Sequence, residues 1–424
     1  MERRAMMREQ LALLEQKLMA CALFKDVTDT EVITALDELL KALRGHLHKD
    51  EYDLLPVYSR FVTALYREGG DLGNFLLTAV QNRDNPAIRL AAGGKALPAA
   101  IEKAMNSELD TFGELSRLQA EDLVLLLETK ADAPLWANTP QDFVKLYSER
   151  LAQAPTKGYG IYAGHHMFTL QGQGALLCPV RNPDPQRLAD LTGYEREREQ
   201  IVLNTKALLQ GLPANNILLY GDAGTGKSST VKALANEFRE EGLRLVEVRK
   251  DQLYQIPGLM DALAENPLKF VLFIDDLSFP TDDGDFTALK AILEGNVSAR
   301  PRNIVVYATS NRRHMVKERF SDRQGDDLHV GDTLEESASL SDRFGLTVTF
   351  LRPDRDLYSR LVLALAGEYG LATPRAELLA RAARPAIRYG GRSPRTARQF
   401  VKLAKAPEAT PNSGFARCWR RDRC

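Results

Sequence analysis

Apolar residues in the first third of the chain recur at the three- and four-residue intervals that are typical of amphipathic helices. The clearest stripe comprises Val32, Ile33, Leu36, Leu39, Leu40 and Leu43. Further helical stretches are expected near residues 53–68, 107–128 and 140–152. The pattern therefore predicts an all-helical N-terminal domain over residues 1–152.

The helical pattern stops between residues 153 and 190, where glycines interrupt aromatic and β-prone residues and a proline-rich stretch follows. Two interpretations fit this composition, an ordered linker and a short β-hairpin. The adjacent residues His165 and His166 do not predict a metal site, because neighbouring side chains point in different directions on a helix or a strand.

Short apolar runs alternate with helical segments from residue 191 onward. The predicted strands cover residues 217–220, 243–248, 270–274, 304–308 and 346–350. This alternation predicts a five-stranded parallel sheet with crossover helices, in a three-layer α/β sandwich over residues 191–352. The pattern of residues 353–405 predicts a small helical lid. Residues 406–424 contain Pro, Ser, Gly and Arg, and this composition predicts a disordered tail.

Composition and charge exclude several broad classes of protein. The 424 residues include 56 Lys plus Arg and 57 Asp plus Glu, which gives a net charge of −1. This charge does not favour the binding of nucleic acid, which would need a local basic patch. No apolar run reaches the roughly 18 residues of a membrane span, and no apolar signal core follows the charged N-terminus. The cysteines are scattered and match neither a disulfide framework nor a zinc site. We therefore expect a cytoplasmic protein without membrane association.

One segment fits the phosphate-loop pattern G-x-x-x-x-G-K-S/T at every fixed position, after a predicted strand and before a predicted helix. It comprises Gly221, Asp222, Ala223, Gly224, Thr225, Gly226, Lys227 and Ser228, and Ser229 continues into the helix. Glycines let backbone N–H groups turn toward phosphate oxygens, and the helix presents its positive dipole end to the same anion. The pattern predicts an ATP site in which Lys227 reaches the β and γ phosphates and Ser228 gives a hydroxyl to Mg²⁺.

A second motif follows the predicted strand 270–274, which ends in the carboxylates Asp275 and Asp276. In phosphate-loop proteins an acid at this place holds Mg²⁺, and we assign that role to Asp275, directly or through water. Asp276 is then placed to orient the attacking water or to accept its proton. The alternative is a turn of two aspartates that caps the next helix.

With these two motifs the chain resembles the AAA+ ATPases. In that resemblance residues 191–195 look like the turn and helix that line the adenine pocket. The run from Tyr307 to Asn311 is similar to sensor 1, a strand between those of the first two motifs, and implies that Asn311 contacts the γ-phosphate or the water. The run from Leu340 to Phe344 resembles an arginine-finger element with Arg343 as the finger. The run from Gly391 to Arg398 resembles sensor 2, with Arg395 reaching back to the γ-phosphate.

More narrowly, the chain is similar to an uncharacterised bacterial family of predicted AAA+ ATPases. The resemblance covers about residues 140–405 and is carried by the runs 275–279, 308–314 and 339–345. The chain departs from the usual superfamily pattern at Asp276, where a glutamate is normal, and the narrower family shares this aspartate. Its side chain is one methylene shorter, so that a water must sit closer or be relayed.

Both arginine assignments have competitors. Arg312, Arg313, Arg319 and Arg323 lie near the finger element, and Arg343 could instead be a surface arginine paired with an acid. For the lid, Arg392 and Arg398 compete with Arg395.

The resemblance implies Mg²⁺-dependent ATP hydrolysis that remodels an unknown protein client recognised by the N-terminal helices. A finger arginine acts on a neighbour's nucleotide, which implies a homo-oligomer, as a ring or open ring. Two alternatives stay open, a nucleic-acid-associated loader or initiator and a nucleotide-gated scaffold with little turnover.

Overall fold

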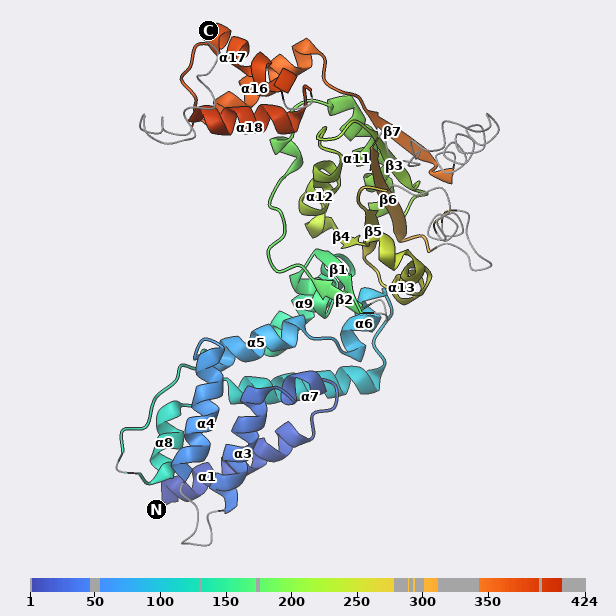
Figure 1. Ribbon diagram of the computed structural model, residues 1–424. Coiled ribbons are helices and arrows are strands. Elements are labelled where there is room, and N and C mark those ends of the chain that lie inside the picture. The colour runs from blue at the N-terminus through green and yellow to red at the C-terminus, as the bar shows by residue number, and fades with distance from the viewer. Residues whose placement is uncertain are drawn as a thin grey trace. The chain divides into compact units, whose positions relative to one another are not determined.

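The protein is described by a computed structural model. It describes residues 2–45, 54–129, 131–172, 176–277, 301–311, 343–388 and 391–405, together with Leu289 and Leu293. The chain forms two compact units (Figure 1). The first unit comprises residues 1–165 and 265–268, and the second comprises residues 166–264 and 269–424. The predicted tail, residues 406–424, lies outside the described residues.

The first unit is helical, as its apolar periodicity predicts. Its helices are α1 (Glu2–Met19), α2 (Lys25–Thr28), α3 (Glu31–Gly45), α4 (Leu54–Arg67), α5 (Leu72–Asn82), α6 (Pro86–Ala92), α7 (Ala99–Leu115), α8 (Ala120–Leu127), α9 (Phe143–Lys157) and α10 (Ile161–Gly164). The predicted stripe on α3 faces the core, where Leu36, Leu39 and Leu40 are fully buried. Aromatic side chains fill the centre of this core, and Phe24 packs edge-to-face on Phe112 and Tyr147.

A buried carboxylate joins two parts of the first unit. Glu108, on α7, accepts hydrogen bonds at 2.9 to 3.1 Å from the backbone N–H groups of Ala22, Leu23 and Phe24, which connect α1 to α2. These bonds satisfy backbone donors that the short connection would otherwise leave without partners. Burial, with the Glu108 charge adding to it, raises the pKa of the neighbouring Cys21 thiol to about 12.

The second unit is built on a seven-stranded sheet in the order β2-β1-β4-β5-β6-β3-β7. Its strands are β1 (Met167–Gln171), β2 (Leu176–Pro179), β3 (Ile217–Gly221), β4 (Leu243–Glu247), β5 (Lys269–Ile274), β6 (Ile304–Asn311) and β7 (Leu346–Phe350). The five predicted strands are present, and each is parallel to its neighbours.

Two further strands extend the predicted sheet. Strands β1 and β2 form an antiparallel hairpin, and β1 pairs in parallel with β4. Of the two interpretations of residues 153–190, the hairpin is therefore correct for its middle part. Buried Phe168 and Leu170 explain why the hairpin joins the sheet instead of standing apart.

Helices cover the sheet and form the lid (Figure 1). The second unit contains η1 (Leu188–Asp190), α11 (Glu195–Leu209), α12 (Lys227–Glu237), η2 (Arg239–Glu241), η3 (Lys250–Gln255), α13 (Ile256–Leu263) and the lid helices α16 (Arg355–Glu368), α17 (Arg375–Arg388) and α18 (Pro394–Lys405). Ile217 and Leu219 pack with residues of α11 and α12, and Leu218, which points to the opposite face of β3, is also fully buried. Burial of both faces agrees with the predicted three-layer sandwich. The lid has its own apolar cluster around Leu361 and Val401.

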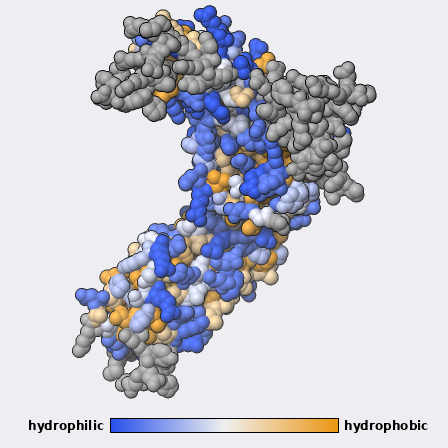
Figure 2. Space-filling view, in the orientation of Figure 1, coloured by the Kyte–Doolittle hydropathy of each residue, from blue (hydrophilic) through white to orange (hydrophobic). Residues whose placement is uncertain are grey.

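On the surface, hydrophobic and hydrophilic residues are interspersed over the face shown in Figure 2. None of the described helices combines the length and the apolar character that a bilayer crossing requires.

Candidate functional site

The phosphate-loop segment leaves β3 at Gly221 and enters α12 at Lys227. Gly221, Gly224 and Gly226 have φ angles of 139°, 76° and 96°, a region that favours glycine. At Gly221 a Cβ atom would also lie 2.1 Å from the backbone oxygen of Phe350 on β7. The glycine therefore allows two parallel strands to approach each other where the loop begins.

Lys227 is buried at the start of α12, with 6% of its surface exposed. Its Nζ donates to the backbone oxygens of Gly221 at 3.0 Å and Asp222 at 2.8 Å, and to Asn311 Oδ1 at 3.0 Å. Burial lowers the pKa of Lys227 to about 8, although the carboxylates Asp222, Asp275 and Asp276 oppose this change. The ammonium group is thus held in the loop by groups that phosphate oxygens could replace.

The first carboxylate of the acid motif lies beside the phosphate loop. Asp275 Oδ1 accepts a hydrogen bond from Ser228 Oγ and another from Thr309 Oγ1, both at 2.6 Å. Thr309 in turn accepts from the backbone N–H of Asp276 at 2.8 Å. The two motifs predicted to share a metal ion therefore have their oxygens in direct contact.

The second carboxylate is joined to the end of β6. Asp276 Oδ1 accepts a hydrogen bond from Asn311 Nδ2 at 2.7 Å. Because Asn311 Oδ1 also accepts from Lys227, the Asn311 side chain bridges the phosphate loop and the acid motif. Strand β6 lies between β3 and β5 in the sheet, which is the place that the sequence resemblance implies for sensor 1.

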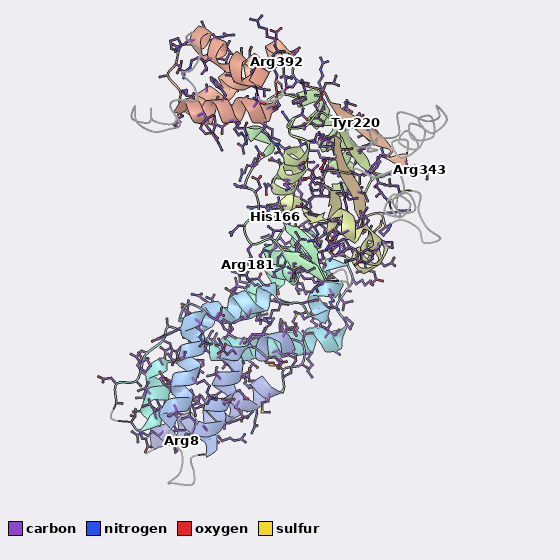
Figure 3. The ribbon with its side chains drawn as sticks, viewed as in Figure 1. Arg8, His166, Arg181, Tyr220, Arg343 and Arg392 are labelled. Carbon is purple, nitrogen blue, oxygen red and sulfur yellow. The ribbon has the colours of Figure 1, made fainter. Side chains whose placement is uncertain are left out.

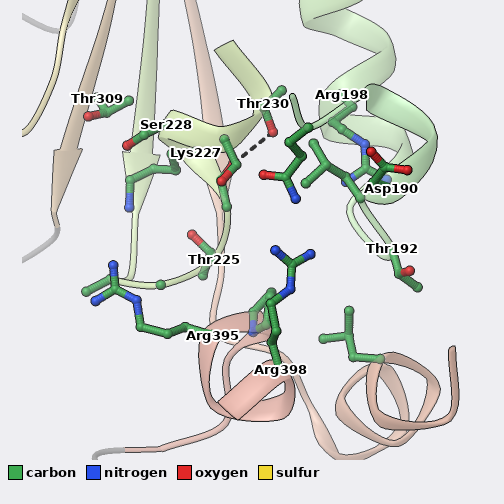
Figure 4. A pocket seen from close by; sticks show the side chains of 18 of the residues that line it. Asp190, Thr192, Arg198, Thr225, Lys227, Ser228, Thr230, Thr309, Arg395 and Arg398 are labelled. Atoms are coloured by element: carbon green, nitrogen blue, oxygen red, sulfur yellow. Dashed lines mark hydrogen bonds between the residues drawn. The ribbon is translucent and has the colours of Figure 1, made fainter. Parts of the chain in front are cut away.

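A cavity of about 640 Å³ opens beside these residues, between the sheet core and the lid (Figure 4). The predicted site residues on its lining are Ala223, Gly224, Thr225, Gly226, Lys227, Ser228, Ser229, Asp275, Asp276, Asn311 and Arg395. Gly221 and Asp222 are not on this lining. Gly221 lies against Phe350, and Asp222 accepts from the backbone N–H of Arg352 at 3.0 Å.

The lid approaches the phosphate loop through α18. The backbone N–H of Arg395 donates to Gly224 O at 3.3 Å, and a Cβ at Gly224 would lie 3.3 Å from the Arg395 Cβ. The Arg395 side chain itself is exposed. Arg398 lines the same cavity, whereas Arg392, the other competitor of Arg395, does not.

Arg343 is not brought to this cavity. It lies just before β7, which is the last strand in the sheet order, and Figure 3 shows it beside that edge. Its competitors Arg312, Arg313, Arg319 and Arg323 lie outside the described residues.

The cavity also contains residues that the sequence did not indicate. Thr309 lies within the sensor-like run, but no motif spacing marks its hydroxyl as a partner of Asp275. The lining also includes Gln186 and Asp190, which precede α11, and Arg198 in its first turn. Burial lowers the pKa of Arg198. Within the described ranges, no cluster of three or more His, Cys, Asp or Glu side chains could hold a metal ion.

Known proteins share part of this sequence. A stretch of 121 residues is 31% identical to the replication factor C large subunit of Staphylothermus marinus, over 26% of this chain and 28% of that protein. The same subunit of Thermofilum pendens is 32% identical over 120 residues, which cover 26% and 29% of the two chains. The matched stretch thus spans less than a third of the length of these relatives.

Among solved structures, part of the chain is similar to the RuvB Holliday junction branch migration motor of Thermotoga maritima. It aligns with 51% of this chain and 63% of its own, at 15% sequence identity and a TM-score of 0.36.

A family model covers more of the chain than any of these stretches. The model described as "Protein of unknown function (DUF815)" matches residues 163–407, which include the hairpin, the sheet, the phosphate loop and the lid. The chain therefore belongs to this family.

Proposed function

We propose that the second unit binds ATP with Mg²⁺ and hydrolyses it. The observation that carries this proposal is the continuous contact of Lys227, Asn311 and Asp276 at the wall of the cavity. The Asn311 amide lies within hydrogen-bonding distance of both the Lys227 ammonium, which is suited to phosphate, and the Asp276 carboxylate, which is suited to water. Such a set is suited to phosphoryl transfer to water, where positioning and charge stabilisation supply most of the catalysis.

The residues present fit both ATP and Mg²⁺. For phosphate, the loop offers the Lys227 ammonium and the N-terminus of α12, whose free N–H groups and dipole attract anions. For the metal, Ser228 Oγ and Asp275 Oδ1 are two oxygen atoms, 2.6 Å apart, that could serve as ligands. Mg²⁺ is commonly held by one or two such protein oxygens together with substrate phosphates and water.

Each residue then has a distinct task. Lys227 would exchange its bonds to Gly221 and Asp222 for phosphate oxygens and balance their charge. Mg²⁺, held by Ser228 and Asp275, would supply positive charge to the β and γ phosphates. Asp276 would orient the attacking water or accept its proton, with Asn311 fixing the direction of the carboxylate.

A homo-oligomer, as a ring or open ring, follows from the position of Arg343 in this proposal. The support for this part of the proposal is that Arg343 precedes the edge strand β7 and is not among the described residues that line its own subunit's cavity, so that it would be available to the nucleotide of a neighbour. We propose that hydrolysis drives the remodelling of a protein client, which the helical first unit recognises.

A second candidate is a nucleic-acid-associated ATPase. Its support is the 31% identity to a replication factor C large subunit over 121 residues. Filter binding of DNA and RNA under a salt titration separates the candidates, because phosphate contacts produce a steep loss of affinity with salt.

ATP binding and turnover test the leading proposal. Titration with a fluorescent ATP analogue and a phosphate-release assay, each with and without Mg²⁺, should show binding and Mg²⁺-dependent release. Lys227→Ala should abolish binding, because Lys227 is the cation that the phosphate loop itself holds, through the backbone oxygens of Gly221 and Asp222. Lys232→Ala is the matched control, since Lys232 lies on the same helix, outside the cavity lining, and pairs with Glu247 at 3.7 Å. Equal affinity of Lys227→Ala and Lys232→Ala would place the nucleotide elsewhere.

A further inference from the structure

The segment that leads from the hairpin to α11 is hydrogen-bonded to the side of α12. Asn236, near the end of α12, donates from Nδ2 to the backbone oxygens of Asp184 and Gln186, both at 2.7 Å. His166 Nε2 lies 2.8 Å from Asn236 Oδ1, which fixes the amide. Two hydrogen bonds to alternate carbonyls hold the backbone of Gln186 in place.

The Gln186 side chain connects the phosphate-loop helix to the lid. With its amide oriented to satisfy its neighbours, the nitrogen donates to Ser229 Oγ at 3.0 Å. The oxygen accepts from both terminal nitrogens of Arg398, at 3.2 and 3.1 Å. Ser229 belongs to α12 and Arg398 to α18, so that a third segment of the chain bridges the two sides of the cavity.

The chemistry of the bridge matters for an anionic ligand. The partner that holds Arg398 is a neutral amide oxygen, which fixes the guanidinium geometrically without cancelling its charge. A carboxylate at the same place would form an ion pair and reduce the attraction of Arg398 for phosphate. Figure 4 shows the side chains of Arg395 and Arg398 diverging from α18, so the two arginines reach different parts of the cavity.

We propose that Gln186 is a positioning residue for nucleotide binding. It holds Arg398 in the cavity through a neutral amide oxygen, so that Arg398 meets the phosphate groups of a nucleoside triphosphate from the lid side. Through Ser229 the same side chain links the phosphate-loop helix to the lid. This inference rests on the proposed function, and it gives Arg398, which the sequence offered as a competitor of Arg395, a role of its own beside Arg395.

Two nearly isosteric substitutions distinguish this role from a structural one. Gln186→Glu can still accept hydrogen bonds from Arg398 and Ser229, but it introduces a negative charge. Gln186→Met keeps the side-chain size and neutrality but loses the hydrogen bonds. If Gln186 only held the fold together, Gln186→Glu would be the milder change. If it keeps the Arg398 charge available, Gln186→Glu should raise the Kd for a fluorescent ATP analogue by about tenfold or more, and by more than Gln186→Met does.

The Arg398→Ala background completes the test. In that background Gln186→Glu should have little further effect on the Kd, because the guanidinium with which the new carboxylate would pair is absent. Gln186 and Arg398 should therefore show a clear coupling energy in a double-mutant cycle. Gln210→Ala, at the exposed end of α11, is the control and should bind as the wild type does. Thermal unfolding of each variant confirms folding.

The outcomes separate the two proposals. Suppose that the wild type binds ATP and that this binding depends on Lys227. If the Kd of Gln186→Glu then equals that of the wild type, or is lower than that of Gln186→Met, the role of Gln186 is overturned and the proposed function stands. A full Gln186→Glu effect that persists in Arg398→Ala overturns that role as well. A wild type that binds no ATP overturns both the proposed function and this inference.

Discussion

Asn311 donates a hydrogen bond from its side-chain amide to the carboxylate of Asp276, over 2.7 Å. The last residue of β6 thereby sets the direction of the carboxylate that follows β5. This contact crosses from one strand to the next, and because Asn311 also accepts from Lys227, a change at Asn311 alters the surroundings of both the carboxylate and the phosphate-loop lysine.

Substitution of the acid motif should separate binding from hydrolysis. Asp276→Asn should retain ATP and lose about 10² to 10⁴-fold in turnover, because an amide can hydrogen-bond water but cannot take its proton. Asp275→Asn should weaken Mg²⁺ dependence as well. Phosphate release across a Mg²⁺ titration measures both effects, with exposed Asp251→Asn as the control. Wild-type turnover in Asp276→Asn would mean that another base acts, or that orienting the water is enough.

ATP affinity should depend on pH through Lys227. Burial lowers the pKa of this lysine to about 8 in the nucleotide-free protein, and bound phosphate would raise it, because phosphate favours the ammonium form. Binding between these two pKa values takes up a proton, so affinity should fall as pH rises above about 8 and stay level below it. Calorimetry at pH 7 and pH 9 in buffers of different ionisation enthalpy measures the uptake. No uptake at pH 9 would contradict the prediction.

Arg343 should act on the nucleotide of a neighbouring subunit. Arg343→Ala should bind ATP with nearly unchanged affinity and lose turnover by about 10³-fold or more, because the guanidinium meets charge that develops in the transition state. Wild-type activity per subunit should also rise with protein concentration.

Mixing two inactive variants tests the action between subunits. Lys227→Ala supplies an intact arginine and Arg343→Ala an intact phosphate loop, so hydrolysis should return in the mixture. If sedimentation shows mixed assembly but the mixture stays inactive, Arg343 acts within its own subunit or only supports the structure.

Glu108 should stabilise the first unit. Glu108→Ala leaves the buried backbone donors of Ala22, Leu23 and Phe24 without their acceptor, at a cost of about 1–3 kcal/mol or more. Exposed Glu102→Ala on the same helix should change stability by no more than about 0.5 kcal/mol. Urea unfolding followed by the fluorescence of buried Trp136, in a Trp419→Phe background, measures both. Equal midpoints would show that water replaces the carboxylate.

The sequence predicts those parts of the molecule that depend on local spacing. The phosphate loop, the Asp275–Asp276 pair and the strand ending at Asn311 each carry a short pattern, and parallel pairing brings their ends together at one edge of the sheet. The hairpin could be recognised but not placed, because its partner β4 is distant in the chain. The sequence could not predict the role of Gln186, because its contacts with Ser229 and Arg398 depend on three segments that are separate in the chain. Local patterns such as periodicity carry no information about contacts of this kind.

The backbone of Asp276 gives a reason for the residue that stands there. Its φ angle is 55°, in the left-handed region, where aspartate and asparagine are several-fold enriched among residues other than glycine. The sharp change of direction lets the next residue, Leu277, donate its N–H to Thr309 O at 2.6 Å. An aspartate, where the AAA+ pattern usually has a glutamate, is therefore suited to this turn. An inactive protein made to capture a client should carry asparagine at this position, since alanine is less suited to the turn and would confuse a loss of chemistry with a loss of shape.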